Sequence, residues 1–128
     1  MRLLLDTHVL LWTLGAPKRL GKEARAIIEN PDNEVMFSAA SIWEIAIKSA
    51  LKRDDFRVAP DEILAAAVDS GFTELPVRSA AAAQVAKLPA HHRDPFDRLL
   101  IAQAITEPTM LYTADPHLEV YSELVHRI

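Results

Sequence analysis

Short apolar runs that stop at a polar residue recur along the chain. Leu3 to Leu5 is an uninterrupted apolar run that ends at Asp6, and the apolar residues from His8 to Leu14 suit a helix better than a strand. An unbroken apolar run is typical of a short strand buried on both faces, as in parallel sheets. The stretch therefore predicts a central strand followed directly by a helix, with Asp6 at their junction.

The same alternation of short strands and helices continues to the end of the chain. The pattern predicts strands at 34–37, 72–77, 110–113 and 124–128, and helices at 20–30, 38–52, 60–70, 78–88 and 94–106. Ser38 and Asp94 suit helix caps, and Pro60 and Pro95 suit first helical positions. Strands that alternate with helices form a parallel sheet covered on both faces. We expect a three-layer α/β/α sandwich around a mostly parallel sheet of four to five strands.

Composition narrows the class of protein. A chain of 128 residues, half apolar and a quarter charged, is expected to form a single domain over 1–128. Its 14 Lys and Arg against 18 Asp and Glu give a formal charge of −4, so any RNA contact has to use a local basic patch. The absence of cysteine excludes disulfides, thiolate catalysis and cysteine-ligated zinc. Without a secretory signal or a membrane-length apolar run, we expect a cytoplasmic protein with no membrane contact.

Four acids stand where strands end or helices begin. Asp6 and Asp115 follow apolar strands, Asp97 begins a helix, and Glu44 lies about two turns into the helix that leaves a strand. In a right-handed βαβ arrangement these places share one edge of the sheet, so the four acids can converge. Like charges in one place raise each other's pKa unless a counterion is present. A divalent cation such as Mg²⁺, which takes oxygen ligands and is completed by substrate phosphate, meets that need.

Each acid also has a purely structural interpretation. Asp6 is a good helix cap, and Asp97 lies near the positive end of a helix dipole. Glu44 and Lys48 form an i,i+4 pair that on an exposed face contributes about 0.2–0.5 kcal/mol. Asp115 precedes a proline and suits a turn. We favour a site at Glu44 because its helix is too apolar to leave much surface exposed.

Four segments together resemble a known family. They are LLLDTHVLLW with Asp6, SAASIWEIAIK with Glu44, RDPFDRLLIAQA with Asp97 and LYTAD with Asp115. In this order and spacing the chain is similar to PIN-domain ribonucleases of the VapC type, the toxins of type II toxin-antitoxin pairs. The resemblance implies Mg²⁺- or Mn²⁺-dependent endonucleolytic cleavage of RNA that leaves the phosphate on the 5′ side of the nick. It also implies a homodimer and an antitoxin that wraps over the toxin and binds operator DNA through its own amino-terminal part.

The resemblance also implies roles for individual residues. Its core metal ligands are Asp6, Glu44 and Asp97. Asp115 would bind more loosely or through water with help from Thr113, and Thr7 could contact metal-bound water. Asp94 is a weaker candidate ligand, because helix capping already accounts for it.

Basic and aromatic side chains near these segments have two interpretations. Five cationic residues flank the predicted site and either steer phosphate, with Lys48, Arg93 and Arg98 as RNA contacts, or form an ordinary solvated face; they are Lys48, Lys52, Arg53, Arg93 and Arg98. We expect His91 and His92 to be solvated, and Trp12 and Trp43 to belong to the core. The helices at 20–30 and 60–70 supply either partner grooves or plain sheet cover.

Three other functions are alternatives to a ribonuclease. A phosphoacceptor receiver domain requires an aspartate at the end of the middle strand and a lysine at the end of a later one, but EVMFS has no Asp and LYTAD has no Lys. An aspartate-nucleophile phosphatase requires an acid at position 8, which is His8. A catalytically inactive PIN-fold interaction module stays open, opposed only by the presence of all four acids.

Overall fold

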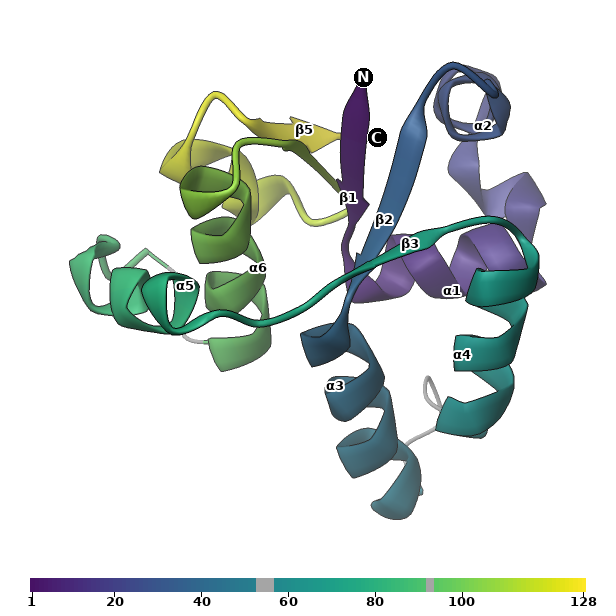
Figure 1. Ribbon diagram of the computed structural model, residues 1–128, viewed down its shortest axis with the longest axis horizontal. Helices are drawn as coiled ribbons and strands as arrows, with labels where there is room; N and C mark the ends of the chain where they lie inside the picture. The colour runs from purple at the N-terminus through teal and green to yellow at the C-terminus, as the bar shows by residue number, and fades with distance from the viewer. Residues whose placement is uncertain (53–56, 92–93) are drawn as a thin grey trace.

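Five parallel strands form the centre of the molecule, as the computed structural model shows for residues 1–52, 57–91 and 94–128. The strands are β1 (Arg2–Leu5), β2 (Glu34–Ser38), β3 (Thr73–Leu75), β4 (Met110–Thr113) and β5 (Val125–Arg127). They lie in the order β3-β2-β1-β4-β5, with β1 in the middle (Figure 1). The predicted mostly parallel sheet is confirmed.

The central strand β1 is buried on both faces, as its unbroken apolar run indicates. Leu3 and Leu5 contribute to one hydrophobic core and Leu4 to the other, because successive side chains of a strand point to opposite faces. Leu4 is paired with Met36 of β2 on one side and Leu111 of β4 on the other. This placement brings Asp6, the residue after β1, to the middle of the carboxyl edge of the sheet.

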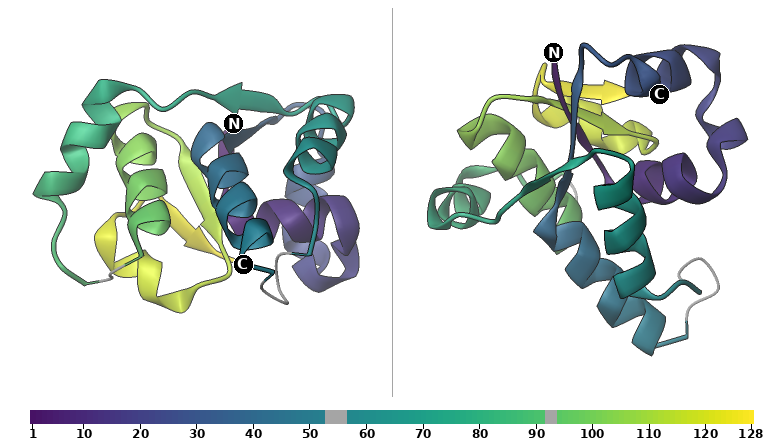
Figure 2. Two further views of the ribbon diagram at one scale, coloured as in Figure 1. Left: turned by 90° about the horizontal axis from the view of Figure 1, so that it is seen from below. Right: turned by 45° about the vertical axis from the view of Figure 1, so that its right-hand side comes forward.

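Helices cover both faces of the sheet (Figures 1 and 2). One face carries α1 (Thr7–Gly15), η1 (Pro17–Leu20), α2 (Lys22–Glu29) and α4 (Pro60–Asp69). The other carries η3 (Val85–Lys87), α6 (Pro95–Thr106) and η4 (Pro116–Tyr121), and α5 (Ser79–Gln84) packs against α6. The remaining helix, α3 (Ala39–Ala50), leaves the carboxyl end of β2 and contacts α4 and α6. In the described part of the chain, no helix has the length and apolarity needed to cross a membrane.

Two predicted helices are shorter than the sequence pattern indicates. The helix predicted from residue 20 begins at Lys22, because Gly21 adopts a φ of +79° that separates η1 from α2. The helix predicted over 78–88 divides into α5 and the 3₁₀ turn η3. The cap predictions hold: Ser38 Oγ accepts from Ala40 N at 3.0 Å, and Asp94 Oδ1 accepts from Phe96 N at 2.9 Å.

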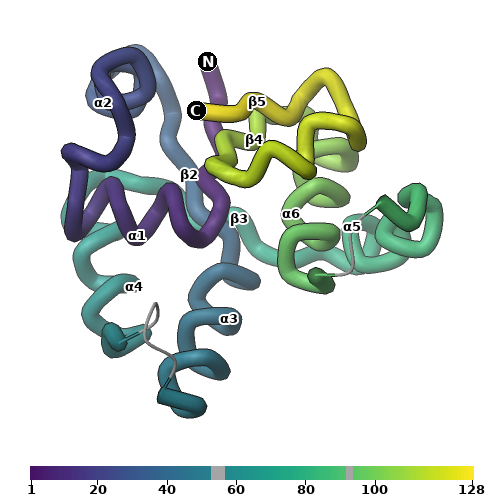
Figure 3. The backbone as a smooth tube through the Cα atoms, turned by 180° about the vertical axis from the view of Figure 1, so that it is seen from behind, coloured from purple at the N-terminus to yellow at the C-terminus, as the bar shows by residue number. Residues whose placement is uncertain are grey.

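The prediction that Trp43 belongs to the core is wrong. The Trp43 side chain is 59% exposed on α3, and Leu51, two turns further on, is 69% exposed. The helix projects beyond the carboxyl edge of the sheet, so the domain covers only the side of α3 that carries Ile45 (Figure 3). Trp43 contacts the edge of the Phe96 ring of α6, with centroids 5.3 Å apart. Trp12, by contrast, is partly buried against the core, as expected.

Candidate active site

The predicted acids line one pocket at the carboxyl edge of the sheet. The pocket has a volume of about 350 Å³. Its lining comes from the ends of β1 and β4, from α1 and α3, and from the beginning of α6, and consists of Asp6, Thr7, His8, Trp12, Glu44, Lys48, Asp94, Asp97, Ala114 and Asp115. The topology therefore brings together residues more than 100 positions apart in the sequence, as the parallel arrangement requires.

Asp6 is both a helix cap and a buried acid of this pocket. Its Oδ1 accepts a hydrogen bond from Val9 N at 2.8 Å, and its Oδ2 accepts one from the Thr113 hydroxyl of β4. Only 5% of Asp6 is exposed, and this burial raises the pKa of its carboxyl group above the ordinary value. The hydrogen bonds from Thr113 and Val9, and the charge of His8, act in the opposite direction.

Glu44 is buried between two donors. Its Oε1 accepts from Thr7 Oγ1 at 2.6 Å, and its Oε2 accepts from Lys48 Nζ at 2.5 Å. Glu44 is 3% exposed, and Ser41 supports Thr7 with its Oγ 3.0 Å from Thr7 Oγ1. The i,i+4 pair of the structural interpretation is thus present, but it lies inside the pocket and not on an exposed face.

The other three acids also have local structural partners. Asp94 caps α6 by accepting from Phe96 N, and Asp97 lies in the first turn of that helix, where the dipole favours negative charge. Asp115 Oδ1 accepts from His117 N at 2.9 Å and begins η4. The backbone N of Asp115 donates to Thr113 Oγ1 at 3.0 Å, so Thr113 connects Asp115 to Asp6.

The pocket supplies the kind of ligand that Mg²⁺ and Mn²⁺ prefer. Its acidic members provide carboxylate oxygens only, which suits a hard divalent cation. Across residues 1–52, 57–91 and 94–128, however, no three acidic or histidine side chains are close enough together to hold an ion as they stand. All four oxygens of Asp6 and Glu44 accept protein hydrogen bonds. A metal ion that binds these oxygens would therefore have to replace hydrogen-bond donors that already contact them.

Three lining residues, His8, Trp12 and Ala114, were not among the sequence candidates. His8 and Trp12 follow Asp6 on α1 and face the pocket. Their positions, two and six residues after the first acid on the same helix, are a signal from which they could have been found, because a helix that starts at the pocket returns to it within one to two turns.

Arg98 lies outside the lining of the pocket. Its guanidinium donates to the carbonyl oxygens of Pro89 at 2.8 Å and Val85 at 3.1 Å, which ties α6 to the η3 segment. Arg53, His92 and Arg93 lie outside the described residues. His91 is exposed, with its ring 5.3 Å from that of Tyr121, and Lys52 is exposed at the end of α3.

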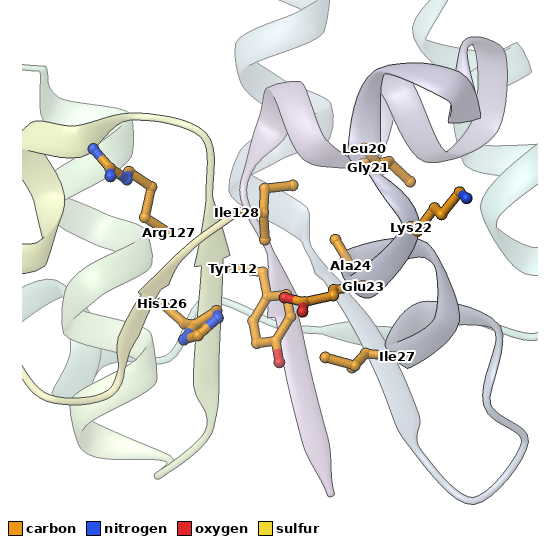
Figure 4. A pocket seen from close by; sticks show the side chains of 10 residues that line it. All are labelled: Leu20, Gly21, Lys22, Glu23, Ala24, Ile27, Tyr112, His126, Arg127 and Ile128. Carbon is orange, nitrogen blue, oxygen red and sulfur yellow. The ribbon is translucent and has the colours of Figure 1, made fainter.

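A separate pocket lies between α2 and the strands β4 and β5 (Figure 4). It has a volume of about 310 Å³, and Tyr112 and His126 line it with their rings 5.0 Å apart. Burial raises the pKa of the Tyr112 hydroxyl. Glu23 is its only lining acid among the described residues, so this pocket has no cluster of carboxylates comparable with that around Asp6.

Comparison with known proteins identifies the family. The model of the PIN domain matches residues 3–124. The chain belongs to the PIN-domain family. Over 115 residues this PIN domain is 33% identical to Ribonuclease VapC22 of Mycobacterium tuberculosis (strain ATCC 25618 / H37Rv), a match that covers 90% of this chain and 88% of that protein. The resemblance to VapC-type PIN proteins is thereby confirmed.

Solved structures share the fold of this PIN domain at low sequence identity. VapBC2 from Rickettsia felis, bound to a DNA fragment from its promoter, matches with a TM-score of 0.74 and 12% identity over 100% of this chain and 99% of that chain. DNA-bound VapBC from Salmonella typhimurium matches with a TM-score of 0.70 and 18% identity, over 99% of this chain and 98% of that chain. VapBC-1 from nontypeable Haemophilus influenzae matches with a TM-score of 0.66 and 14% identity, over 100% of this chain and 97% of that chain. These matches confirm the predicted PIN-like α/β/α sandwich.

Proposed function

We propose that this PIN domain is a metal-dependent endoribonuclease and the toxin of a type II toxin-antitoxin pair. The observation that carries the proposal is the convergence of Asp6, Glu44, Asp97 and Asp115 on one pocket at the carboxyl edge of the sheet. The similarity to a protein named Ribonuclease VapC22 supports RNA as the substrate. We further propose that residues 1–128 act as one domain.

The acids of the pocket have different proposed roles as metal ligands. Asp6, Glu44 and Asp97 are the proposed principal ligands of Mg²⁺ or Mn²⁺, and Asp115 is a looser one. The ion would supply a water of lowered pKa and would neutralise charge that develops on the scissile phosphate. Asp94 is held by capping α6 and borders the pocket as a weaker candidate ligand.

Two threonines position the principal acids. The Thr7 hydroxyl fixes Oε1 of Glu44, and the Thr113 hydroxyl fixes Oδ2 of Asp6 while it accepts from the backbone N of Asp115. Because both hydroxyls are buried, each carboxylate is kept in one orientation before any ion or substrate arrives. These contacts would orient the carboxylates toward a shared ion.

The substrate contacts proposed here are local. With a formal charge of −4, the chain offers no general attraction to RNA, so cations at the pocket have to meet the phosphate. Lys48 lies in the pocket lining, and Arg93 stays a prediction from the sequence. We do not propose Arg98 as an RNA contact, because its guanidinium donates hydrogen bonds to backbone carbonyl oxygens.

An antitoxin is the proposed protein partner, and operator DNA an indirect one bound through it. A pocket of about 520 Å³ between α1 and α4 is lined by Leu11, Val58 and Ile63, and it shares His8 and Trp12 with the acid pocket. A chain segment laid in this groove would reach the acids directly. The related complexes described as VapBC assemblies support such a partner.

We also propose a homodimer in the cytoplasm. An exposed apolar stripe, called the α3 stripe, consists of Trp43 and Ile47 on α3 and Leu51, which caps the end of the helix. A stripe of this kind on a soluble domain marks an association surface. A second copy of the chain is the occupant that the family resemblance implies.

The deciding experiment is RNA cleavage by the purified chain separated from any partner. We expect cleavage of single-stranded RNA in Mg²⁺ and none in EDTA, and loss of cleavage in Asp6→Asn and Asp97→Asn without a lower melting temperature. Unchanged cleavage in both variants would refute the metal-site assignment. A wild-type protein that binds its antitoxin but cuts no RNA in Mg²⁺ would instead be an inactive interaction module.

A further inference from the structure

Lys48 is a cation already built into the acid pocket. Its Nζ lies 2.5 Å from Glu44 Oε2, and its side chain is 16% exposed. A pair at this separation and burial differs from a surface salt bridge, because solvent screens it far less. Lys48 is therefore a substantial part of what keeps the Glu44 charge tolerable in the folded protein.

The position of Lys48 is defined by more than its i,i+4 spacing from Glu44. Its Nζ lies 5.8 Å from the centroid of the Phe96 ring of α6, and Phe96 in turn contacts Trp43 of α3. The ammonium group is thus held between a carboxylate of its own helix and an aromatic ring of the neighbouring helix. Both helices supply acids of the pocket, Glu44 from α3 and Asp97 from α6.

The ammonium group and a divalent cation need the same atom. Glu44 Oε2 accepts from Lys48, while Oε1 accepts from Thr7. A hard cation in direct contact with Oε2 would stand within a few ångströms of Nζ, where two positive charges repel strongly in a buried site. Among the described residues, moreover, no three acidic or histidine side chains are placed to share an ion.

We propose that Lys48 is the resident counterion of Glu44 and that a divalent cation binds by displacing its ammonium group. The affinity for the metal is then set by a competition inside the protein, and Lys48 lowers it. This inference rests on the proposed metal-dependent function, and it adds a group that balances the charge of Glu44 when the ion is absent.

A calorimetric titration with Mn²⁺ tests the proposal without an activity assay. Wild type, Lys48→Met and Lys52→Met are compared in the same buffer. Lys52 lies four residues further on, exposed in the turn that follows α3, so Lys52→Met removes the same charge from a nearby position without touching Glu44. We expect Lys48→Met to bind Mn²⁺ about tenfold more tightly than wild type, equivalent to about 1.4 kcal/mol. Lys52→Met should match wild type.

Melting temperatures give a second readout if the first variant is poorly folded. Lys48→Gln keeps a donor but not the charge, and we expect its metal-free form to melt below wild type and Mn²⁺ to raise its melting temperature by more than it raises that of wild type. A third readout is the distance from Lys48 Nζ to Glu44 Oε2 in a wild-type crystal soaked in Mn²⁺, which should exceed 4 Å because an ion pair no longer exists beyond that separation.

The outcomes separate the two proposals. Equal or weaker Mn²⁺ binding by Lys48→Met, with tight binding by wild type, overturns the counterion role and assigns Lys48 a supporting role for the metal. An ammonium group that stays at hydrogen-bond distance from Glu44 in the Mn²⁺-soaked crystal overturns it as well. Absence of Mn²⁺ binding in all three proteins refutes the proposed metal-dependent function itself.

Discussion

Replacing Asp6 by asparagine should stabilise the metal-free protein at neutral pH. Asp6 is almost fully buried, and this burial raises the pKa of its carboxyl group. A raised pKa in the folded state means that ionisation works against folding. The stabilising contribution of the protonated carboxyl is complete below its unfolded pKa and is lost as the pH rises through the folded pKa. At a pH above the ordinary carboxyl value, Asp6 therefore costs folding free energy that an amide does not.

The contacts of Asp6 let an amide replace it with little other loss. Asparagine is as good a helix cap as aspartate, so its Oδ1 continues to accept from Val9 N. The Thr113 hydroxyl, which donates to Asp6 Oδ2, can rotate and accept from an amide nitrogen. We expect a net gain of about 1 kcal/mol at pH 7.5, within the range of about 0.5–2 kcal/mol usual for stabilising substitutions. For a domain of this size that raises the melting temperature by about 4 °C.

Thermal unfolding in EDTA from pH 4 to pH 8 measures this effect, because the loss of stability begins near the ordinary carboxyl value of 3.8 and continues up to the folded pKa. The advantage of Asp6→Asn over wild type should grow as the pH rises. The matched variant Asp6→Ala, which loses the cap, should fall about 1 kcal/mol below Asp6→Asn at every pH. In a separate series without EDTA, free Mg²⁺ at ten times its dissociation constant should stabilise wild type by about 1.4 kcal/mol and leave Asp6→Asn unchanged. A difference between Asp6→Asn and wild type that does not vary with pH would refute the reasoning.

Three further predictions follow from other contacts. Thr113→Val removes the donor to Asp6 and the acceptor for Asp115 N, so we expect Mg²⁺ binding weaker by about tenfold in calorimetry, in the range typical for residues that orient metal ligands; unchanged affinity would contradict the positioning role. Leu51→Asp places a charge in the exposed α3 stripe and should convert a dimer to a monomer in light scattering, whereas the exposed Lys52→Met control should stay dimeric. Arg98→Ala removes the donors to Val85 and Pro89 and should lower stability by about 1–2 kcal/mol in denaturant titration, with RNA cleavage at 20 °C intact; a loss of cleavage without a loss of stability would favour the RNA contact predicted from the sequence.

The sequence predicts those features that local pattern determines. The run Leu3 to Leu5 predicts a strand buried on both faces, and the Asp94-Pro95 pair predicts where α6 begins; both are as the structure has them. The alternation of strands and helices predicts the parallel sheet, and the apolar run predicts that the strand before Asp6 is central; the order of the strands itself is known only from the structure.

The sequence pattern does not predict features that depend on tertiary packing. The apolar face of α3 is wide enough to be a core face, but its periodicity does not reveal that the helix extends past the sheet and leaves Trp43 exposed. The spacing of Glu44 and Lys48 predicts an ion pair, and the apolar residues of the helix predict that Glu44 is buried, but the sequence does not show that Trp43 beside it is exposed. The predicted sharing of an ion by the acids stays untested, because it depends on side-chain orientation that no sequence pattern records.

The Thr113 hydroxyl contacts two acids that follow different strands: it donates to the Asp6 carboxylate after β1 and accepts from the backbone N of Asp115 after β4. Any partner that shifts the segment after β4, and with it the backbone of Asp115, would therefore also turn the carboxylate of Asp6. Inhibition of this protein would not require anything to enter the pocket, because a ligand that pulls on one rim can misalign the deepest acid from outside.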